Sequence, residues 1–321
     1  MDIKEKFELI KRNTVEIVEE SELMDVLKKK TSPKVYCGYE VSGEVHLGHM
    51  VTTTKLLDFQ KAGFDVIVLL ADWHTWLNRK GDWKEIEKMV LLWKKIFKGL
   101  GLEKARFVLG SEIQRNIEYI DDVFTISVQT TIQRALRSMQ EIARDIENAK
   151  VSQVIYPFMQ IVDIKALKVD VAYSGIEQRK IHMLAREVLP KLNSKAQVCV
   201  HTPLIPSLQG PGSKMSSSVP ESLISVRDSE EDVRKKINKA YCPAGETKDN
   251  PVLAIAQLIV FPRIKSLCIK RDKKFGGDID IGSYSELEKI FREKKLHPMD
   301  LKKAISEQLI GILSPVRKLF R

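Results

Sequence analysis

The sequence predicts an α/β protein: a Rossmann-like, doubly wound parallel sheet with a helical insertion, followed by a smaller, mostly α-helical C-terminal domain. Two observations lead to this class. Short, β-branched apolar runs alternate with amphipathic stretches of helical period through the first two-thirds of the chain, as in sheets buried between helices. The 321 residues, of which 43% are hydrophobic, also exceed what one compact core usually holds, so two domains are expected.

Five apolar runs are predicted to be strands of this sheet, at residues 35–39, 64–71, 106–109, 169–173 and 198–201. Two helices are predicted between them: one spans 47–62 and stops at Gly63, and the other spans 83–97, before Gly99 and Gly101. Residues 127–148, rich in Arg, Gln and Glu, read as one long helix that interrupts the alternation. This helix is assigned to an insertion between two halves of the sheet, at about residues 112–150.

The stretch 207–220, SLQGPGSKMSSSVP, consists mostly of Gly, Pro and Ser. This composition favours a mobile loop and a domain boundary over a packed element. The predicted organisation is therefore a Rossmann-like domain at 1–206, a loop and linker at 207–220, and a helical domain at 221–321. In the last of these, Ser229 and Asp232 resemble a capping box that starts a helix ending at Ala240, and further helices are expected near 252–260, 285–293 and 300–313.

The charge balance suits a polyanionic partner. The chain has 53 basic and 43 acidic side chains, a net charge of +10, and residues 221–321 carry +6 of it. The four cysteines are far apart, which argues against a disulfide framework or a structural zinc site and fits a reducing cytoplasm. The N-terminus is charged and the apolar runs are too short to span a bilayer, so a cytoplasmic location without a membrane partner is expected.

The first functional motif lies at 35–49, VYCGYEVSGEVHLGH, where a strand ends and a helix begins near two histidines. Ligands of open α/β sheets bind at the carboxyl ends of strands, and a helix N-terminus favours phosphate. We expect His46 and His49 to share a face and bracket a phosphate, and Gly48 to let an adenine ring approach closely. The alternative is a helix cap with two ordinary histidines. No third ligand lies at metal-binding spacing, so no metal site is predicted.

The second motif is Lys214–Ser218, KMSSS, within the 207–220 loop. One lysine and three hydroxyls on a flexible loop suit transient contact with a polyphosphate whose charge develops during a reaction. The alternative is a solvated, Ser-rich linker.

Together, HLGH after the first strand and KMSSS after the last, some 165 residues later, resemble the signature pair of class I aminoacyl-tRNA synthetases. The resemblance implies that an amino acid is activated with ATP, giving an aminoacyl adenylate and pyrophosphate, and is then transferred to the 3′ end of a tRNA. Such a reaction depends on positioning and on stabilising phosphoryl charge more than on acid–base side chains.

A polar stripe on residues 154–167, VIYPFMQIVDIKAL, indicates which amino acid is bound. This segment is predicted to be a helix with Pro157 in its first turn, and Tyr156, Gln160 and Asp163 lie on one face. The positions around them are apolar, so the stripe is costly to bury unless something satisfies it. One interpretation is an internal hydrogen-bond network. The other is a pocket for tyrosine, in which Asp163 accepts from the phenol and Tyr156 and Gln160 hold the ammonium group.

Tyr36, the Y-P-x-M-Q-x-x-D run at 156–163 and SGIEQRKIHM at 174–183 resemble tyrosyl-tRNA synthetases of the archaeal and eukaryotic type. The similarity extends through KKFGGD at 273–278 and HPMD at 297–300. It implies a homodimer, through the inserted region, that takes L-tyrosine, ATP with Mg²⁺, and tRNA(Tyr). The implied site residues are for the phenol Tyr36 and Asp163; for the ammonium end Tyr156, Gln160 and Gln178; for ATP Glu40, Gly48, His49, Glu177, Lys214 and Ser217; and for catalysis His46, His49, Lys214, Ser216 and Ser217.

Two positions depart from the family pattern. Val41 stands where many relatives have proline, so the turn before HLGH is expected to be less rigid. Ser217 stands where class I enzymes usually have a second lysine, which leaves Lys214 as the motif's one cation.

In the C-terminal domain the resemblance implies that Phe275 and Asp300 read the first anticodon base. An exposed aromatic ring can stack on an unpaired base, and a carboxylate can accept from a base edge. The alternatives from the residues alone are that Phe275 belongs to the core and that Asp300 is the N-cap of the last helix.

Three other functions are compatible with parts of this pattern. A tryptophanyl-tRNA synthetase shares the fold and the signatures, but Asp163 and Tyr36 suit a phenol better than an indole. A synthetase-like RNA-binding protein without activation activity is disfavoured by the intact motifs, and a small-molecule nucleotidyltransferase by the basic second domain. Amino-acid-dependent exchange between ATP and pyrophosphate distinguishes them.

Overall fold

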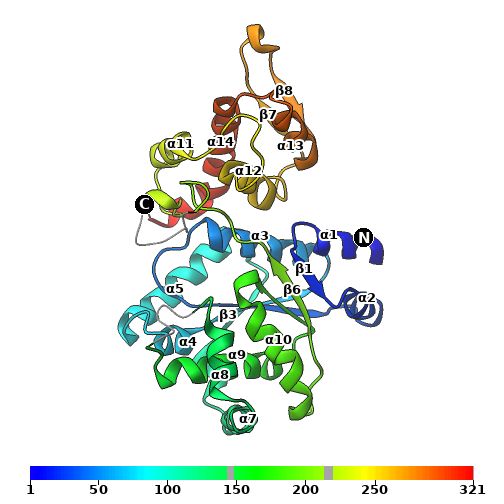
Figure 1. Ribbon diagram of the computed structural model, residues 1–321, viewed down its shortest axis with the longest axis vertical. Helices are drawn as coiled ribbons and strands as arrows, with labels where there is room; N and C mark the ends of the chain where they lie inside the picture. The colour runs from blue at the N-terminus through cyan, green and yellow to red at the C-terminus, as the bar shows by residue number, and fades with distance from the viewer. Residues whose placement is uncertain (143–147, 213–219, 321) are drawn as a thin grey trace. The chain divides into compact units, whose positions relative to one another are not determined.

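The computed structural model describes residues 1–142, 148–212 and 220–320 (Figure 1). The chain divides into two compact units. Unit 1 comprises Met1–Ser42, Lys55–Lys94 and Leu102–Pro203, and unit 2 comprises Gly43–Thr54, Lys95–Gly101 and Leu204–Arg321.

A six-stranded sheet forms the centre of unit 1, in the order β1-β6-β5-β2-β3-β4. Its strands are β1 (Glu16–Val18), β2 (Lys34–Tyr39), β3 (Asp65–Leu70), β4 (Arg106–Leu109), β5 (Val171–Gly175) and β6 (Val198–Thr202). All pairings are parallel except that of β1 with β6. Because β2 pairs with both β3 and β5, the chain winds outward from β2 in two directions. This is the doubly wound α/β arrangement that the sequence predicts.

In the described part of the chain, ten α-helices begin in unit 1 or pass through it. They are α1 (Ile3–Lys11), α2 (Glu20–Lys29), α3 (Leu47–Lys61), α4 (Asp72–Leu77), α5 (Trp83–Gly99), α6 (Gly110–Gln114), α7 (Ile117–Val128), α8 (Ile132–Met139), α9 (Val151–Ala166) and α10 (Arg179–Val188). Helices α7 to α10 pack on one another, with α9 in contact with the other three (Figure 1). One apolar core is shared by these helices and strands β2, β3 and β5. A polar group on the buried face of α9 therefore lies far from solvent.

The structure corrects two expectations for unit 1 and adds a strand. Residues 127–148 are not one helix: α7 ends at Val128, and Thr131 starts α8 by accepting a hydrogen bond from the Arg134 N–H. Helix α9 begins at Val151, three residues earlier than predicted, so Pro157 lies in its second turn and not its first. The antiparallel strand β1 was not predicted, because three residues are too few to form a recognisable apolar run.

Unit 2 contains the C-terminal helices and a β-hairpin. Its elements are α11 (Glu230–Lys239), α12 (Pro251–Ile255) with a π-helical turn at Ala256–Val260, β7 (Leu267–Ile269), β8 (Ile279–Ile281), α13 (Tyr284–Arg292) and α14 (Pro298–Arg317). Helices α11, α12 and α14 pack together, and β7 contacts α14. Ser229 caps α11 through the Asp232 N–H, as the sequence predicts.

Two alternatives considered for unit 2 are wrong. Phe275 is not a core residue, since 63% of it is exposed at the tip of the β7–β8 hairpin, in a 3₁₀ turn at Lys273–Phe275. Asp300 is not the N-cap of α14. His297 holds that position and accepts from the Met299 N–H, whereas Asp300 lies within the first turn.

Among the described residues, every helix is too short or too polar to cross a bilayer.

Candidate active site

The switch point of the sheet lies between β2 and β5, and Glu40 and Glu177 follow the carboxyl ends of these two strands. Open α/β sheets bind ligands in the crevice at this point. Glu40 forms an ion pair with Lys80 and accepts from Asn78 Nδ2 at 2.8 Å. The carboxylate is therefore held in place and partly neutralised, which lets an anionic ligand lie near it.

Asp163, on the buried face of α9, is the centre of a hydrogen-bond network. Its Oδ1 accepts from Gln114 Nε2 at 2.9 Å and from the Tyr119 hydroxyl at 2.8 Å. Its Oδ2 is also buried but has no hydrogen-bond partner among the described residues. Burial raises the pKa of Asp163 to about 7, although the bonds from Gln114 and Tyr119 act in the opposite direction. One oxygen is thus fixed, and the other remains as an acceptor for a ligand.

Two tyrosines line the same region. Tyr36 is on β2 and Tyr156 on α9, and burial raises the pKa of each well above its usual value, with Asp163 adding to the effect. The Tyr156 ring packs edge-on against His74, with centroids 4.5 Å apart. Both phenols therefore stay protonated near neutral pH and can act as hydrogen-bond donors.

The polar residues toward the switch point are amides and one carboxyl group. Gln160 Nε2 donates to Gln178 Oε1 at 3.3 Å. Burial raises the pKa of Glu177, whose Oε2 has no hydrogen-bond partner in the described part of the chain. A Cβ on Gly175 would overlap that oxygen, so a larger residue there would displace the Glu177 carboxyl group. The structure brings all the residues predicted for tyrosine together within unit 1, on β2, α9 and the turn after β5.

The HLGH turn belongs to unit 2. His49 Nδ1 accepts from the His46 N–H at 3.2 Å, and His46 Nδ1 accepts from the Gly48 N–H at 3.1 Å. Burial lowers the pKa of His46 to about 4, so its ring is neutral and carries its proton on Nε2. The centroids of the His46 and His49 rings are 4.1 Å apart. The cap that the sequence offered as an alternative is therefore present, and it also leaves His46 Nε2–H as a donor. A Cβ on Gly48 would lie 2.9 Å from the His46 ring. The missing side chain of Gly48 therefore makes room for that ring.

The loop that carries the second motif starts and ends at fixed points. The Leu208 N–H donates to the Ser222 carbonyl, which closes the loop at its base. Beyond the loop, Ile224 and Val226 are hydrogen-bonded to Leu47 and Val45, on either side of His46. The chain after the loop is thus joined to the HLGH turn. The predicted residues Lys214, Ser216 and Ser217 lie outside the described residues.

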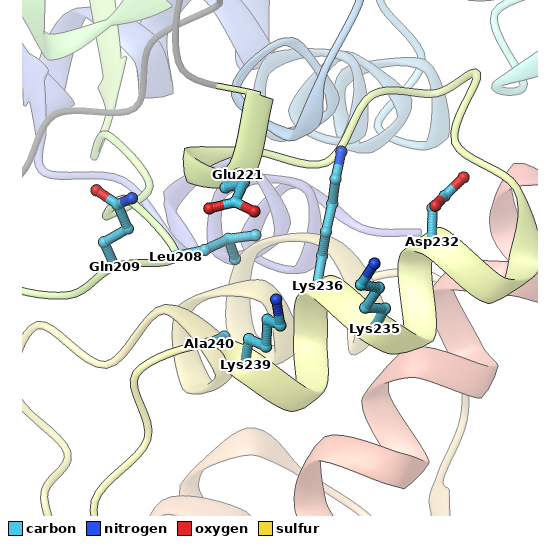
Figure 2. A pocket seen from close by; sticks show the side chains of 8 residues that line it. All are labelled: Leu208, Gln209, Glu221, Asp232, Lys235, Lys236, Lys239 and Ala240. Carbon is cyan, nitrogen blue, oxygen red and sulfur yellow. The ribbon is translucent and has the colours of Figure 1, made fainter.

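A cavity of about 260 Å³ lies beside α11 in unit 2 (Figure 2). Figure 2 shows the side chains of Lys235, Lys236 and Lys239 extending from this helix on the side that Glu221 and Leu208 line. Lys236 is held by Asp228 at 2.7 Å, whereas Lys235 and Lys239 are exposed. The cavity is thus a solvated, mainly basic surface beside the base of the loop.

The described residues contain no group of three or more His, Cys, Asp or Glu side chains arranged to hold a metal ion.

Comparison with known proteins connects these features. The family model "tRNA synthetases class I (W and Y)" matches residues 28–314. The chain belongs to this class I synthetase family.

Several archaeal relatives of this class I synthetase are similar over nearly their whole length. The tyrosine–tRNA ligase of Methanocaldococcus jannaschii is 52% identical over 315 residues, which are 98% of this chain and 99% of the relative. A crystal structure of tyrosyl-tRNA synthetase from Archaeoglobus fulgidus, complexed with L-tyrosine, has a TM-score of 0.96 at 50% identity and 99% coverage of both chains. The corresponding Pyrococcus horikoshii structure, also with L-tyrosine, has a TM-score of 0.91 at 36% identity and covers 100% and 96%. The family uses ATP.

Several residues of the candidate site were missed in the sequence. His74, Gln114 and Tyr119 surround Asp163, and Asn78 and Lys80 hold Glu40. His74 and Gln114 lie a few residues after β3 and β4, at the edge where parallel sheets bind ligands. Applying that rule to every predicted strand, and not only to the first, would have found both.

Proposed function

We propose that this class I synthetase is a tyrosine–tRNA ligase. The observation that carries the proposal is the buried Oδ2 of Asp163, an acceptor without a protein partner among the described residues, beside Tyr36 and Tyr156. A site with an unsatisfied buried acceptor selects a ligand that supplies a hydroxyl donor. Named tyrosine–tRNA ligases about 50% identical over nearly the full chain support the same choice.

The chemistry follows from which groups face which part of the substrates. Tyr36 and Asp163 hold the phenol, and Tyr156, Gln160 and Gln178 hold the ammonium group. The tyrosine carboxylate then attacks the α-phosphorus of ATP, and the bond to the bridging oxygen of pyrophosphate breaks. The adenylate formed passes tyrosine to a hydroxyl at the 3′ end of tRNA(Tyr), and AMP leaves.

The ATP side is assigned to the HLGH turn, Glu40 and Glu177. The neutral imidazole of His46 offers a fixed Nε2–H donor to a phosphate oxygen. The centroid of the His49 ring lies 4.1 Å from the centroid of the His46 ring. Glu177 Oε2, buried and without a partner in the described residues, suits a ribose hydroxyl. Lys214, Ser216 and Ser217 are proposed to close on the phosphates, since the chain after their loop is hydrogen-bonded beside His46. Bound Mg²⁺ would neutralise phosphate charge that these donors also stabilise.

We also propose that the chain forms a homodimer through α7. One face of this helix exposes Ile117, Phe124 and Val128, with exposed fractions of 76%, 62% and 86%. Large apolar side chains repeated on one helix face are typical of a surface that a partner covers. Phe124→Glu should convert a dimer to a monomer in analytical ultracentrifugation. A wild-type chain that sediments as a monomer would contradict the proposal.

Unit 2 is proposed to bind the tRNA. The ring of Phe275, exposed at the hairpin tip, suits stacking on a splayed base, and Asp300 is proposed to accept from the edge of the first anticodon base. The lysines of α11 suit contact with the phosphate backbone. The domain assignment proposed from the sequence is a catalytic domain at 1–206, the KMSSS loop at 207–220 and an anticodon-binding domain at 221–321.

The decisive experiment is exchange of label between pyrophosphate and ATP with each of the twenty amino acids. Exchange with tyrosine alone is expected. Exchange with tryptophan instead would indicate the other amino acid that this family serves. Exchange with none would favour an RNA-binding protein without activation activity.

A further inference from the structure

Three buried polar atoms around Asp163 lack hydrogen-bond partners in the described residues. They are Asp163 Oδ2, His74 Nε2 and Gln114 Oε1. His74 Nε2 lies 3.7 Å from Asp163 Oδ2, which is too long for a hydrogen bond between them. Buried polar atoms are nearly always paired in native proteins, so unpaired neighbours of this kind indicate a place that a ligand completes.

The chemistry of the partners determines the orientation of the Gln114 amide. Its nitrogen lies 2.9 Å from Asp163 Oδ1, and a carboxylate only accepts, so the NH₂ group must face the aspartate. The same nitrogen lies 3.3 Å from His74 Nδ1. Because an NH₂ group only donates, Nδ1 must be the accepting nitrogen of the imidazole.

This pairing determines the tautomer of His74. Burial lowers its pKa to about 4, with a hydrogen bond to the Tyr156 backbone acting in the opposite direction, so the ring is neutral near pH 7. A neutral imidazole carries one proton, and with Nδ1 accepting, that proton is on Nε2. An N–H donor and a carboxylate acceptor therefore lie 3.7 Å apart with nothing between them in the described residues.

We propose that His74 is a further binding residue for the substrate hydroxyl, with its Nε2–H donating to the phenol oxygen while the phenol proton is donated to Asp163 Oδ2. Gln114 is a positioning residue that fixes the donor tautomer of His74 and the free oxygen of Asp163. The inference rests on the proposed tyrosine specificity and adds a second donor, beside the Tyr36 hydroxyl, to the lone pairs of the substrate hydroxyl.

A donor beside an acceptor recognises a hydroxyl more completely than an acceptor alone. His74 Nε2 and Asp163 Oδ2 are 3.7 Å apart, which is less than the combined length of two hydrogen bonds. One ligand oxygen beside the line between them can therefore lie within hydrogen-bond distance of both atoms. A ligand with only hydrogen at this position leaves both atoms unpaired. Phenylalanine therefore loses two hydrogen bonds at this site, one to each atom.

The test compares His74→Leu with His74→Gln, whose amide can still donate. The kcat/KM of amino-acid-dependent exchange is measured with tyrosine, phenylalanine and 4-aminophenylalanine, which can donate but accepts weakly. His74→Leu should lower the tyrosine-to-phenylalanine ratio roughly three- to tenfold, the range for one neutral hydrogen bond, and should barely change kcat/KM for 4-aminophenylalanine. His74→Gln should restore most of the ratio.

His182→Leu is the matched control. His182 is also fully buried and neutral in unit 1, but it pairs with His201 Nε2 at 3.0 Å. This variant should lower stability without changing the ratio. If His74→Leu lowered exchange with tyrosine and phenylalanine equally, His74 would be a structural residue and the inference would be overturned.

A spectroscopic measurement tests the tautomer without any variant. Two-bond ¹⁵N–¹H correlation spectra distinguish neutral histidines protonated on Nε2 from those protonated on Nδ1. His74 should show the Nε2–H pattern, and the Nδ1–H pattern would refute the argument. If the wild-type chain did not exchange with tyrosine at all, the proposed function would fail separately from this inference.

Discussion

The Asp163 pocket of unit 1 and the lysine cavity beside α11 of unit 2 contain charged groups in opposite settings. Asp163 is 1% exposed, its hydrogen-bond partners come from two other helices, and its pKa is raised to about 7. Lys235 and Lys239 are exposed to solvent on one helix. The first setting makes a missing hydrogen bond expensive, so it supports selection between similar ligands. The second is screened by salt, so it supports attraction to any polyanion and little discrimination.

The largest expected effect is that of Asp163→Asn on amino-acid selection. The change keeps the shape but removes the charged acceptor, and a hydrogen bond to a charged group contributes about 1.5–3 kcal/mol. The ratio of kcat/KM for tyrosine over phenylalanine in exchange assays should fall roughly 10- to 100-fold. Tyrosyl-tRNA synthetases, which reject phenylalanine by a factor of about 10⁵, are the standard example of selection by hydrogen bonds to a substrate hydroxyl.

Asp122→Asn is the control for that change. Asp122 pairs with Lys165 on α9 but lies at the surface end of the helix layer, 19% exposed. It should leave the ratio unaltered. An unaltered ratio in Asp163→Asn would mean that the phenol binds elsewhere.

The next effect concerns Asp300 in unit 2. If its carboxylate accepts from a base edge, Asp300→Ala should narrow the preference for the natural first anticodon base by about 1–3 kcal/mol, measured by aminoacylation of substituted tRNAs. Tyrosine-dependent exchange should not change. His297→Ala is the matched control, because His297 is the N-cap of α14: it should lower the melting temperature and leave the base preference intact. If Asp300→Ala lowered the melting temperature and left the base preference intact, Asp300 would have a structural role.

A pH dependence should separate the two regions. The folded pKa of Asp163, about 7, lies above its usual 3.8, so the folded state holds the proton more tightly. Its contribution to stability is therefore complete below pH 4 and is lost as the pH rises toward 7, and Asp163→Asn should abolish that part of the decline in urea unfolding. The groups that face it are His74, Tyr36, Tyr119, Tyr156 and Asp72.

Tyrosine binding should follow the ionised form. Since the phenol donates to a carboxylate, kcat/KM for tyrosine should fall about tenfold per pH unit below 7, whereas that for phenylalanine should not fall in the same way. A kcat/KM for tyrosine that is flat between pH 5.5 and 8 would contradict this role for the carboxylate.

The smallest effect is expected for the lysine cavity. Lys235→Gln and Lys239→Gln should raise the KM for tRNA a few-fold, and each lost phosphate contact should lower the slope of log KM against log salt by about 1. Lys29→Gln, which removes an exposed lysine paired with Asp25 in unit 1, is the control. If base preference changed instead of the salt slope, the cavity would be a site of base recognition.

The sequence by itself predicted what local patterns encode. Strands β2, β3, β4 and β6 were predicted to within one residue at each end because their apolar, β-branched runs satisfy a buried parallel sheet. The polar stripe on α9 marked Asp163, because a carboxyl group among apolar neighbours needs a specific partner. The helical pattern after HLGH predicted that its histidines lie at the start of a helix, which is α3.

The tertiary structure decided which groups meet. Gln114 is 49 residues before Asp163, and His74 is farther still, so no periodicity relates them. One long helix was expected at 127–148, but α7 ends at Val128 and Thr131 caps the start of α8. A capping side chain can end a helical pattern locally, because it offers the backbone another hydrogen bond. Likewise Asp300 is a preferred N-cap by residue type, and only the backbone shows that the helix uses His297 instead. A one-dimensional pattern reports the face of an element that is buried, whereas the partner buried against it depends on packing between distant segments.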